Sequence, residues 1–285
     1  MYSGLLPSYL DSLVQRALAE DVGSGDITTL AIVESEQRAI GRAIARAALV
    51  VCGEPIFSRV FYSIDPGLRV EALLDEGVWA KEGDVLWLVE GSASPILTGE
   101  RTALNFAQRL SGIATLARRF VSELPDGAST RITDTRKTTP GLRGLERYAV
   151  RCGGGHNHRE HLGSAVLIKD NHIQLAGGVR EALLRAQKNA PHTSRIEVEV
   201  ESLQALDQAL EAGADLVLLD NFEAGNIAEA VTRAAGRARV EVSGGVRLAD
   251  VSSLARAGVD YISVGALTHS APAADIALEV ENLGS

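Results

Sequence analysis

The chain has 285 residues, 23% of them charged and 46% hydrophobic, an ordinary composition for a globular protein of one or two domains. Its 28 basic and 37 acidic residues give a formal net charge of −9, and this balance, with few aromatic residues, argues against nucleic acid as a partner. No apolar run approaches the roughly 20 residues that span a bilayer, so we expect no membrane partner.

The amino-terminal residues 1–7 lack the basic and apolar segments of a signal peptide, which predicts a cytoplasmic protein. Apolar residues spaced three and four apart over residues 10–18 predict a helix that Ser8 can cap. An acidic, turn-rich stretch, residues 20–29, follows this helix. Its carboxylates could bind a metal, but such a stretch is more typical of a helix end followed by an Asx turn.

Strands and one long helix are expected in the next hundred residues. The strand candidates are residues 41–51, 67–73 and 85–89. The helix is expected to begin near Ser94 and Pro95, because serine caps helices and proline suits the first helical position. It runs to about Leu124 and carries a polar stripe formed by Arg101, Asn105 and Gln108.

From about residue 128, short apolar runs alternate with helix-like segments. The apolar runs are residues 132–133, 165–168, 196–200, 216–219, 240–242 and 261–264, and the helix-like segments are residues 178–188, 202–212, 224–235 and 248–257. This alternation is typical of βα units around a parallel sheet. About six strands, without a GxGxxG turn or a P-loop, favour an α/β barrel over a doubly wound sheet.

Each apolar run ends in a polar residue or a glycine, where parallel α/β folds carry their functional sites. These endings are Asp134, Lys169, Glu199 or Glu201, Asp220, Ser243 with Gly244 and Gly245, and Gly265. Glycine-containing turns after the last strands are typical of phosphate sites built from backbone N–H groups. The sequence therefore predicts a site at the carboxyl ends of these strands.

Residues 134–172 concentrate basic side chains within this acidic chain. The stretch holds four histidines, the triple glycine 153–155 and the basic residues Arg136, Lys137, Arg143, Arg147, Arg151, Arg159 and Lys169. Arginines can grip carboxylate or phosphate through two parallel hydrogen bonds, and glycines leave backbone N–H groups open to oxygen ligands. The cluster predicts a pocket for a small, multiply charged anion.

Two features of this region allow more than one interpretation. Lys169 could form a Schiff base, contact a phosphate or carboxylate, or make a plain ion pair, and its basic surroundings favour the anion contact. The alternation in residues 197–201 turns the glutamates to one face and the valines to the other, which suits an exposed edge strand or a barrel interior. Buried carboxylates need cations, which Arg136, Lys137 and Lys169 can supply, so we favour the interior.

The histidines and cysteines do not predict a zinc site. The four histidines between His156 and His172, taken with Cys152, match no standard zinc spacing, and the adjacent arginines would repel a divalent ion. Histidines that donate hydrogen bonds to an anionic ligand are the favoured interpretation. Cys52 and Cys152 are 100 positions apart and are expected to be reduced thiols.

Six motifs follow one another in order along the chain, at residues 20–29, 99–105, 109–115, 134–141, 153–159 and 168–172. Together they resemble the quinolinate phosphoribosyltransferase family, also called nicotinate-nucleotide pyrophosphorylase (carboxylating), from about residue 8 to the carboxyl terminus. The resemblance implies an α/β fold with an N-terminal α/β sandwich, residues 1–110, completed by the tail 268–285. Residues 111–267 would form an incomplete, open parallel α/β barrel with the catalytic site.

The resemblance also implies a reaction and its ligands. Members of the family join quinolinate to 5-phosphoribosyl 1-diphosphate with Mg²⁺ and release nicotinate mononucleotide, diphosphate and CO₂, a step of de novo NAD synthesis. They form homodimers or assemblies of dimers, and the neighbouring subunit completes each active site.

Matched position by position, the family's functional residues fall on named positions of this sequence. The quinolinate carboxylates would meet Arg136, His158, Arg159 and Lys169, with Arg101 reaching in from the other subunit. The catalytic residues would be Lys137 and Lys169, which contact the phosphoribosyl substrate, and Glu199 and Asp220, which hold the ribose hydroxyls and Mg²⁺. The 5-phosphate would be held by Ser243, Gly244 and Gly265.

Alternatives from other functional classes stay open on the sequence. A lysine-dependent aldolase would use Lys169 as its Schiff-base former. A catalytically silent anion-binding protein would bind the ligand without releasing diphosphate. A paralogue linked to molybdenum transport shares the fold, and no residue of this chain favours it.

Overall fold

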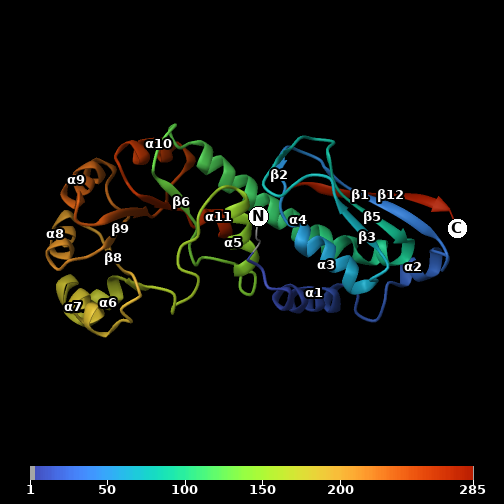
Figure 1. Cartoon of the computed structure of the whole chain (residues 1–285), viewed down its shortest axis with the longest axis horizontal. Helices are drawn as coiled ribbons and strands as arrows, with labels where there is room; N and C mark the ends of the chain where they lie inside the picture. The colour runs from blue at the N-terminus through green and yellow to red at the C-terminus, as the bar shows by residue number, and fades with distance from the viewer. Residues whose placement is uncertain (1–3, 285) are drawn as a thin grey trace. The chain divides into compact units, whose positions relative to one another are not determined.

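The computed structural model describes residues 4–284, which divide into two compact units (Figure 1). The first unit contains the described residues up to Arg118, the segment Thr139–Gly154 and the described residues from Ser270, and the second contains Arg119–Thr138 and Gly155–His269. The domain boundaries expected from the sequence, at residues 110 and 267, stay a prediction. Residues 1–3, part of the stretch that lacks a signal-peptide pattern, lie outside the described residues.

An antiparallel sheet organises the first unit, with its strands in the order β12-β1-β5-β3. These strands are β1 (Arg38–Ala45), β3 (Arg69–Ala72), β5 (Val85–Ser92) and β12 (Ile276–Gly284). Alternate residues of β1 are buried, as expected for a sheet with one face on the core. Because β12 pairs with the whole length of β1, the carboxyl-terminal strand completes a sheet that begins near the amino terminus. A short ladder joins β2 (Leu49–Val50) and β4 (Trp79–Ala80).

The helices that begin in the first unit are α1 (Pro7–Asp21), α2 (Ile27–Ile32), α3 (Glu54–Ile64), α4 (Ala93–Ser122) and α5 (Arg143–Cys152). Helix α1 begins at Pro7 with Leu6 at its cap position, so the predicted Ser8 cap is wrong. Proline fits there because a first-turn N–H has no partner within the helix. Asp26 caps α2 by accepting the N–H of Thr29 at 3.0 Å, so the structure has a helix N-cap in the stretch where the sequence predicted an Asx turn after the first helix.

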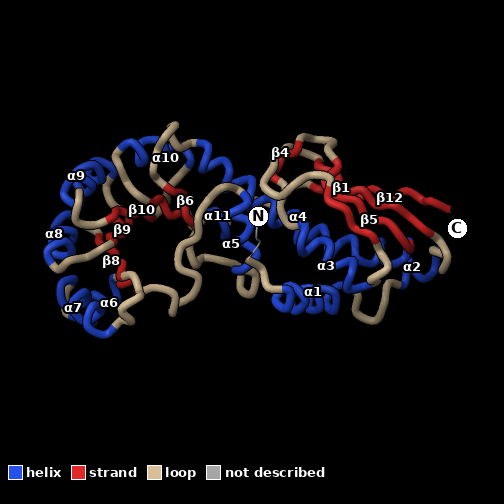
Figure 2. The backbone as a smooth tube through the Cα atoms, viewed as in Figure 1, coloured by secondary structure: helices blue, strands red, loops and turns tan. Residues whose placement is uncertain are grey.

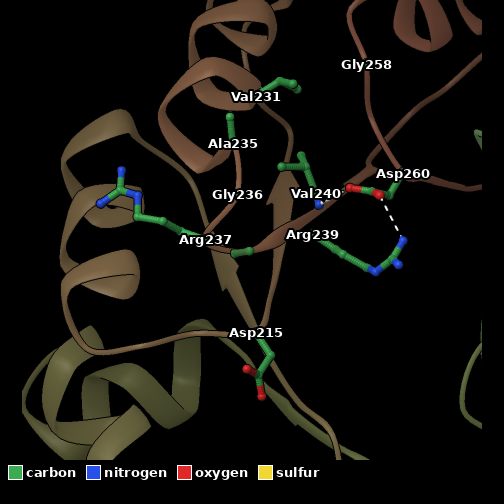
Figure 3. Close-up of a pocket in the computed structure, with 10 residues that line it drawn as sticks. Asp215, Val231, Ala235, Gly236, Arg237, Arg239, Val240, Gly258 and Asp260 are labelled. Carbon is green, nitrogen blue, oxygen red and sulfur yellow. Dashed lines mark hydrogen bonds and ion pairs between the residues drawn. The ribbon is translucent and has the colours of Figure 1, made fainter.

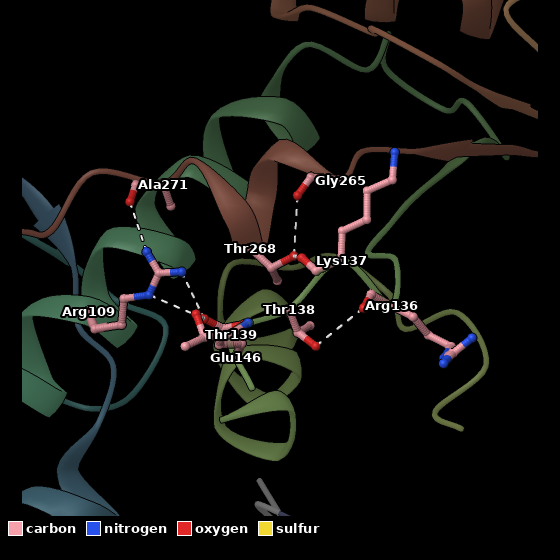
Figure 4. Close-up of polar contacts among 9 residues, drawn as sticks. All are labelled: Arg109, Arg136, Lys137, Thr138, Thr139, Glu146, Gly265, Thr268 and Ala271. Atoms are coloured by element: carbon pink, nitrogen blue, oxygen red, sulfur yellow. Dashed lines mark hydrogen bonds and ion pairs between the residues drawn. The ribbon is translucent and has the colours of Figure 1, made fainter. Parts of the chain in front are cut away.

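Two buried clusters hold the first unit together. The ring of Phe57 lies 5.1 Å from that of Phe61 and 4.7 Å from that of Trp87, between centroids. The fully buried carboxylate of Glu146, on α5, accepts hydrogen bonds from Arg109 Nη2 at 2.8 Å and from the N–H of Thr139 at 3.0 Å (Figure 4). A lone buried carboxylate would be costly, so these bonds tie α4, α5 and the turn at residue 139 together.

Among the described residues, a six-stranded parallel sheet organises the second unit, in the order β6-β11-β10-β9-β8-β7. The strands are β6 (Arg131–Thr133), β7 (Val166–Ile168), β8 (Ile196–Val200), β9 (Leu216–Asp220), β10 (Arg239–Ser243) and β11 (Tyr261–Ser263). The sheet is open, because β6 and β7 are the two ends of its order. The α/β fold class expected from the sequence is therefore confirmed.

Helices cover the outer side of this parallel sheet. The helices that begin in the second unit are α6 (Asp170–Ala176), α7 (Val179–Asn189), α8 (Leu203–Glu211), α9 (Ala224–Ala234), α10 (Leu248–Arg256) and α11 (Ala266–His269). Figure 2 shows α7, α8, α9 and α10 outside the arc of strands. Within residues 4–284, no helix is both long and apolar enough to cross a membrane.

Strand register brings the polar strand endings to one edge of the parallel sheet. Asp220, the last residue of β9, pairs with Ser243, the last residue of β10. Glu199 lies one position before the end of β8, which neighbours β9. Beyond β6, the N–H of His156 donates to the carbonyl of Ile132 at 2.8 Å, so the segment after the triple glycine docks on that edge strand. Side chains from five segments can therefore meet at the carboxyl ends of the strands.

Candidate active site

A cavity of about 300 Å³ opens at the carboxyl ends of the parallel strands. It is lined by Thr135, Arg136, Lys137, His158, Arg159, Leu167, Lys169, Glu199, Leu218, Asp220, Glu241, Ser243 and Ser263, all in the second unit. Most residues singled out from the sequence are in this set. Gly244 and Gly265 belong to the turns that follow β10 and β11. Arg101 lies on α4 in the first unit, largely exposed and 3.9 Å from Glu100.

The loop after β6 carries two of the cavity's cations. A tight turn shapes it, because the N–H of Lys137 donates to Thr135 Oγ1 at 3.1 Å and the N–H of Thr138 donates to the carbonyl of Arg136 at 3.0 Å. The buried Nε of Arg136 has no hydrogen-bond partner among the described residues. A buried N–H of a guanidinium without an acceptor is costly, so this group suits an incoming anion.

Thr268, fully buried on α11, holds the same loop from beside it (Figure 4). Its hydroxyl donates to the carbonyl of Lys137 at 2.8 Å and lies 3.2 Å from the carbonyl of Gly265. The loop of cations and the glycine turn after β11 are therefore fixed to each other. Space is tight there, since a Cβ on Gly265 would lie 3.0 Å from Cδ of Lys137.

Arg159 brings a second guanidinium close to that of Arg136. Its Nη1 donates to the carbonyl of Ala165 at 3.1 Å, which fixes the direction of the side chain. Burial, and then the positive charge of Arg136, lower the pKa of Arg159. Two like charges held near each other in a half-buried cavity favour an anion between them.

His158 sits between two buried carboxylates at the floor of the cavity. Its Nε2 lies 3.1 Å from Glu197 Oε2 and 3.4 Å from Glu241 Oε1. Burial alone would lower the pKa of His158, but the hydrogen bonds to the two glutamates outweigh it and raise the pKa to about 10. Nδ1 accepts the N–H of Arg159 at 2.7 Å, a geometry that suits a ring with its proton on Nε2. We therefore treat the three groups as one cluster that keeps a proton above the ordinary histidine range.

The cluster is itself anchored to the sheet. Glu241 accepts a hydrogen bond from the hydroxyl of Ser263, which lies 2.6 Å from the hydroxyl of Thr133. Burial raises the pKa of Glu197, whose Oε1 is buried without a hydrogen-bond partner among the described residues. The floor is thus rigid, acidic and able to retain a proton.

Lys169 and Glu199 form an ion pair at the cavity wall, with Nζ and Oε2 2.7 Å apart. The lysine side chain is 47% exposed and that of the glutamate 9%, so the lysine can turn toward a ligand while the carboxylate stays fixed. An ammonium group paired in this way lacks the free electron pair that a Schiff base needs. The geometry favours a contact with an anion over an aldolase lysine.

The alternation predicted for residues 197–201 is confirmed for the strand. Val198 and Val200 are buried on the side of α7 and α8, while Glu197 and Glu199 are buried toward the interior cavities. Glu201 follows the end of β8 and is exposed. Of the two glutamates considered as the strand ending, Glu199 is the one that lines the cavity.

Carboxylates and glycine turns supply the rest of the site. Asp220 lines the cavity beside Glu199, and its Oδ2 accepts the side-chain N–H of Asn221 at 2.9 Å. Gly244 has φ of +98°, and a Cβ there would lie 2.3 Å from Asn221 Oδ1, so glycine is required. Two carboxylates offer the hard oxygen ligands that Mg²⁺ prefers, so the donor set fits that ion.

The histidines and Cys152 do not gather into one metal site. Within the described residues, the groups with metal-ligand spacing are His158 with Glu197 and Glu241, and Cys52 with Glu76 and Cys152. The second group lies in the first unit, where Cys52 and Cys152 are buried thiols. Burial raises the pKa of Cys52, which disfavours a reactive thiolate.

A larger hollow of about 520 Å³ lies at the other end of the sheet (Figure 3). Its two arginines already have protein partners. Arg239 pairs with Asp260 at 3.0 Å, and Arg237 donates to the carbonyl of Arg233. Size alone therefore does not mark the functional cavity.

Sequence reasoning missed part of the cavity lining, namely Thr135, Leu167, Leu218, Glu241 and Ser263. Glu241 had a usable signal, because residues 240–242 repeat the valine–glutamate alternation of β8. Ser263 and Thr135 stand next to predicted positions but carry no pattern of their own. The apolar lining residues look like any other core residue in a sequence.

Comparisons with known proteins agree with one another. The family described as Quinolinate phosphoribosyl transferase, C-terminal domain, matches residues 113–279, and its N-terminal domain counterpart matches residues 26–111. The probable nicotinate-nucleotide pyrophosphorylase (carboxylating) of Bacillus subtilis is 39% identical, covering 95% of this chain and 93% of that protein. The Mycobacterium leprae nicotinate-nucleotide pyrophosphorylase (carboxylating) is 42% identical, covering 94% and 95%. The crystal structure of NadC from Streptococcus pyogenes has a TM-score of 0.94 at 41% identity, covering 98% and 99%.

Proposed function

Because the chain belongs to the quinolinate phosphoribosyltransferase family, we propose that it joins quinolinate to 5-phosphoribosyl 1-diphosphate. The products are nicotinate mononucleotide, diphosphate and CO₂, so the enzyme is a phosphoribosyltransferase of de novo NAD synthesis. The observation that carries this proposal is the cavity itself, where guanidinium and ammonium groups meet two carboxylates and glycine turns. One substrate needs cations for its carboxylates, and the other needs carboxylates for its ribose hydroxyls.

Quinolinate would be held by Arg136, His158, Arg159 and Lys169. The unpartnered Nε of Arg136 and the mutual repulsion of the two arginines support this role. A planar guanidinium matches a carboxylate through two parallel hydrogen bonds, which a single ammonium group cannot do. Quinolinate carries two adjacent carboxylates, so two guanidiniums suit it better than one.

Lys137, Lys169, Glu199 and Asp220 would bind the phosphoribosyl substrate. Support for the carboxylates comes from their position at the ends of adjacent strands β8 and β9. Glu199 and Asp220 would hold the ribose hydroxyls and Mg²⁺, and the ion, when bound, would stabilise the departing diphosphate. Ser243, Gly244 and Gly265 would hold the 5-phosphate through the turns that follow the last two strands.

During the reaction, the carboxylates of the cavity would stabilise the positive charge that develops on the substrate. As diphosphate departs, positive charge develops on the ribose, and the carboxylates of Glu199 and Asp220 stabilise it. The ring nitrogen of quinolinate then attacks, which leaves a positive nitrogen beside the carboxylate at C2. Loss of CO₂ leaves an electron pair on C2 next to that nitrogen, and a proton completes nicotinate mononucleotide. The adjacent positive charge stabilises the electron pair, so decarboxylation needs no further organic cofactor.

The enzyme would act in the cytoplasm as a homodimer or an assembly of dimers. Arg101 would then reach the quinolinate site of a second copy of the chain. Its exposed side chain on α4, near Glu100 at 3.9 Å, is available for such a contact and supports the proposal. Arg101→Ala should therefore weaken quinolinate binding although the residue lies outside the barrel cavity of its own chain.

Turnover tests the proposed function directly. The purified chain is supplied with quinolinate, 5-phosphoribosyl 1-diphosphate and Mg²⁺, and nicotinate mononucleotide and CO₂ are followed together. Equal amounts of both products are expected, and omission of Mg²⁺ should abolish them. Folded protein that forms neither product under these conditions would contradict the proposal.

A further inference from the structure

Asp134 is a fully buried carboxylate directly after β6 to which the family resemblance gives no role. It directly precedes one stretch of chain that carries anion contacts and is hydrogen-bonded to another. Arg136 and Lys137 follow it within three positions, and His158 and Arg159 lie on the segment that docks beside β6. A carboxylate in this place is costly unless it accepts strong hydrogen bonds.

The two oxygens of Asp134 accept from two different donors on the docked segment. Oδ1 accepts the backbone N–H of His158 at 2.7 Å, and Oδ2 accepts the side-chain N–H of Asn157 at 2.6 Å. The N–H of Asp134 itself donates to the carbonyl of His156 at 3.1 Å. Three consecutive residues of the segment are therefore tied to one aspartate.

This segment has little regular structure to position it. It touches β6 through an isolated parallel bridge between Thr133 and His156, not through a ladder. The triple glycine before it leaves the backbone conformationally permissive. Without the carboxylate, the buried N–H of His158 would lose a charge-assisted hydrogen bond, and the segment would be free to shift.

We propose that Asp134 is a positioning residue for quinolinate, which sets where His158 and Arg159 meet the pyridine dicarboxylate. The inference rests on the proposed function and names the element that aligns its quinolinate site. Asp134 acts through the segment and makes no contact with the substrate. Of the groups assigned to the phosphoribosyl substrate, Lys169, Glu199 and Asp220 lie at other strands. Lys137 is on the same loop as Asp134, but Thr268 holds its carbonyl at 2.8 Å independently of the docked segment, so the effect should fall mainly on quinolinate.

Asp260 offers a matched control on the same sheet. Its carboxylate also accepts one backbone N–H, that of Val240 at 2.9 Å, and one side-chain donor, Arg239 Nη1 at 3.0 Å. It lies at the opposite, amino-terminal end of the strands. The Asp260 side chain is 32% exposed, so its loss should destabilise the fold less than loss of the buried Asp134. The comparison is therefore of the KM for quinolinate, which should rise selectively only in the Asp134 variants.

The experiment compares Asp134→Ala, Asp134→Asn, Asn157→Ala and Asp260→Ala by steady-state kinetics with each substrate varied. Asp134→Ala should raise the KM for quinolinate about 30-fold, the KM for 5-phosphoribosyl 1-diphosphate should change less than about twofold, and kcat at saturation should be nearly kept. Asp134→Asn should recover only part of the loss and leave the KM for quinolinate raised about fivefold, because its amide oxygen can still accept the N–H of His158 whereas its NH₂ group cannot accept the side-chain N–H of Asn157. Asn157→Ala and Asp260→Ala should leave the KM for quinolinate within about threefold.

Equal losses for both substrates in Asp134→Ala, or an equal rise in the quinolinate KM in Asp260→Ala, would overturn the inference. If Asp134→Ala does not fold, Asp134→Asn decides: a selective rise in the quinolinate KM supports the inference, and unchanged kinetics overturn it.

Calorimetric binding of quinolinate separates this inference from the proposed function. A wild-type chain that binds quinolinate without turnover contradicts the function alone, and weaker binding by the Asp134 variants would still support the positioning role. Binding equal to that of the wild type would overturn it.

Discussion

The parallel sheet of the second unit has hollows at both ends, and the larger one is not the candidate active site. At the amino-terminal end, about 520 Å³ is lined by Arg239 paired with Asp260 and by Arg237 bonded to a carbonyl. At the carboxyl-terminal end, about 300 Å³ holds two guanidiniums close enough for one to lower the pKa of the other. The difference lies in the arginines: both arginines at the amino-terminal end are bonded to acceptors of the protein, whereas at the carboxyl-terminal end the buried Nε of Arg136 has no hydrogen-bond partner among the described residues.

The two ends also differ in how the backbone builds them. At the carboxyl end, Asp134, Lys169, Asp220 and Ser243 each follow or end a strand, so one sheet edge gathers side chains from distant parts of the sequence. At the amino-terminal end, the hollow is lined by the end of α9 and the starts of β10 and β11, where side chains bond to the backbone groups of the chain itself. Side chains that converge from several strands around a buried polar atom without a partner, the Nε of Arg136, are therefore a better guide to function than volume.

The largest expected effect comes from removing the guanidinium that lacks a partner. Arg136→Ala should raise the KM for quinolinate by about 100-fold, because a buried charge-assisted contact to a carboxylate typically contributes about 2–5 kcal/mol. Arg136→Lys should recover little, since an ammonium group cannot form the two parallel hydrogen bonds. Steady-state kinetics with quinolinate varied would measure both. A normal KM for quinolinate in Arg136→Ala would contradict the proposed contact between Arg136 and a quinolinate carboxylate.

Next in size is the loss of the fixed carboxylate on β8. Glu199→Gln should lower kcat by about 100-fold, because it removes the negative charge proposed to stabilise the ribose as it becomes positive, and it weakens the ion pair with Lys169. The Mg²⁺ concentration needed for half-maximal rate should rise as well. Rates measured across a Mg²⁺ series would check this, and unchanged kcat with unchanged Mg²⁺ dependence would argue against the role.

A smaller effect on quinolinate binding is expected when the pH rises far enough to remove the proton of His158. Against the effect of burial, the two glutamates raise its pKa to about 10, so the cluster keeps its proton through neutral pH and the KM for quinolinate should rise as pH passes about 10. A raised histidine pKa contributes stability that is complete below about pH 6.5 and is lost as pH rises toward about 10. The free energy of unfolding should fall over that window. In His158→Gln both pH dependences should flatten, and a wild-type-like profile would show that another group titrates.

The smallest effect is expected at the amino-terminal hollow. Arg239→Ala removes an exposed ion pair and should cost at most about 1 kcal/mol of unfolding free energy. Its kcat and both KM values should match those of the wild type. Thermal unfolding and kinetics on the same preparation would measure this. A selective rise in either KM would contradict the expectation that the amino-terminal hollow takes no part in substrate binding.

The sequence predicted the parallel sheet closely because its strands are short, apolar and regularly spaced. The run at residues 196–200 coincides with β8, and the helix-like segment 178–188 is displaced by one residue from α7. The first unit was harder to predict. Helix α3 was missed, and the predicted strand 41–51 is divided between β1 and β2, because burial there depends on partners far away in the chain, such as β12.

The candidate site also contains some residues that could be predicted from the sequence and others that could not. Residues that end strands, such as Lys169 and Asp220, could be predicted because a parallel sheet puts all strand ends on one edge. The buried partners could not. Nothing in the sequence indicates that Asp134 accepts the N–H of His158, or that Glu241 and Glu197 flank its ring, since those contacts depend on three-dimensional register.

Where quinolinate binds is the most direct test of the central claim, that the carboxyl-end cavity is the functional one. A crystal structure of the chain with quinolinate would decide it. We expect the two carboxylates to lie within hydrogen-bond distance of Arg136 and Arg159, with Lys169 released toward the ligand from Glu199. Quinolinate bound at the amino-terminal hollow beside Arg239, with the carboxyl-end cavity empty, would contradict the account.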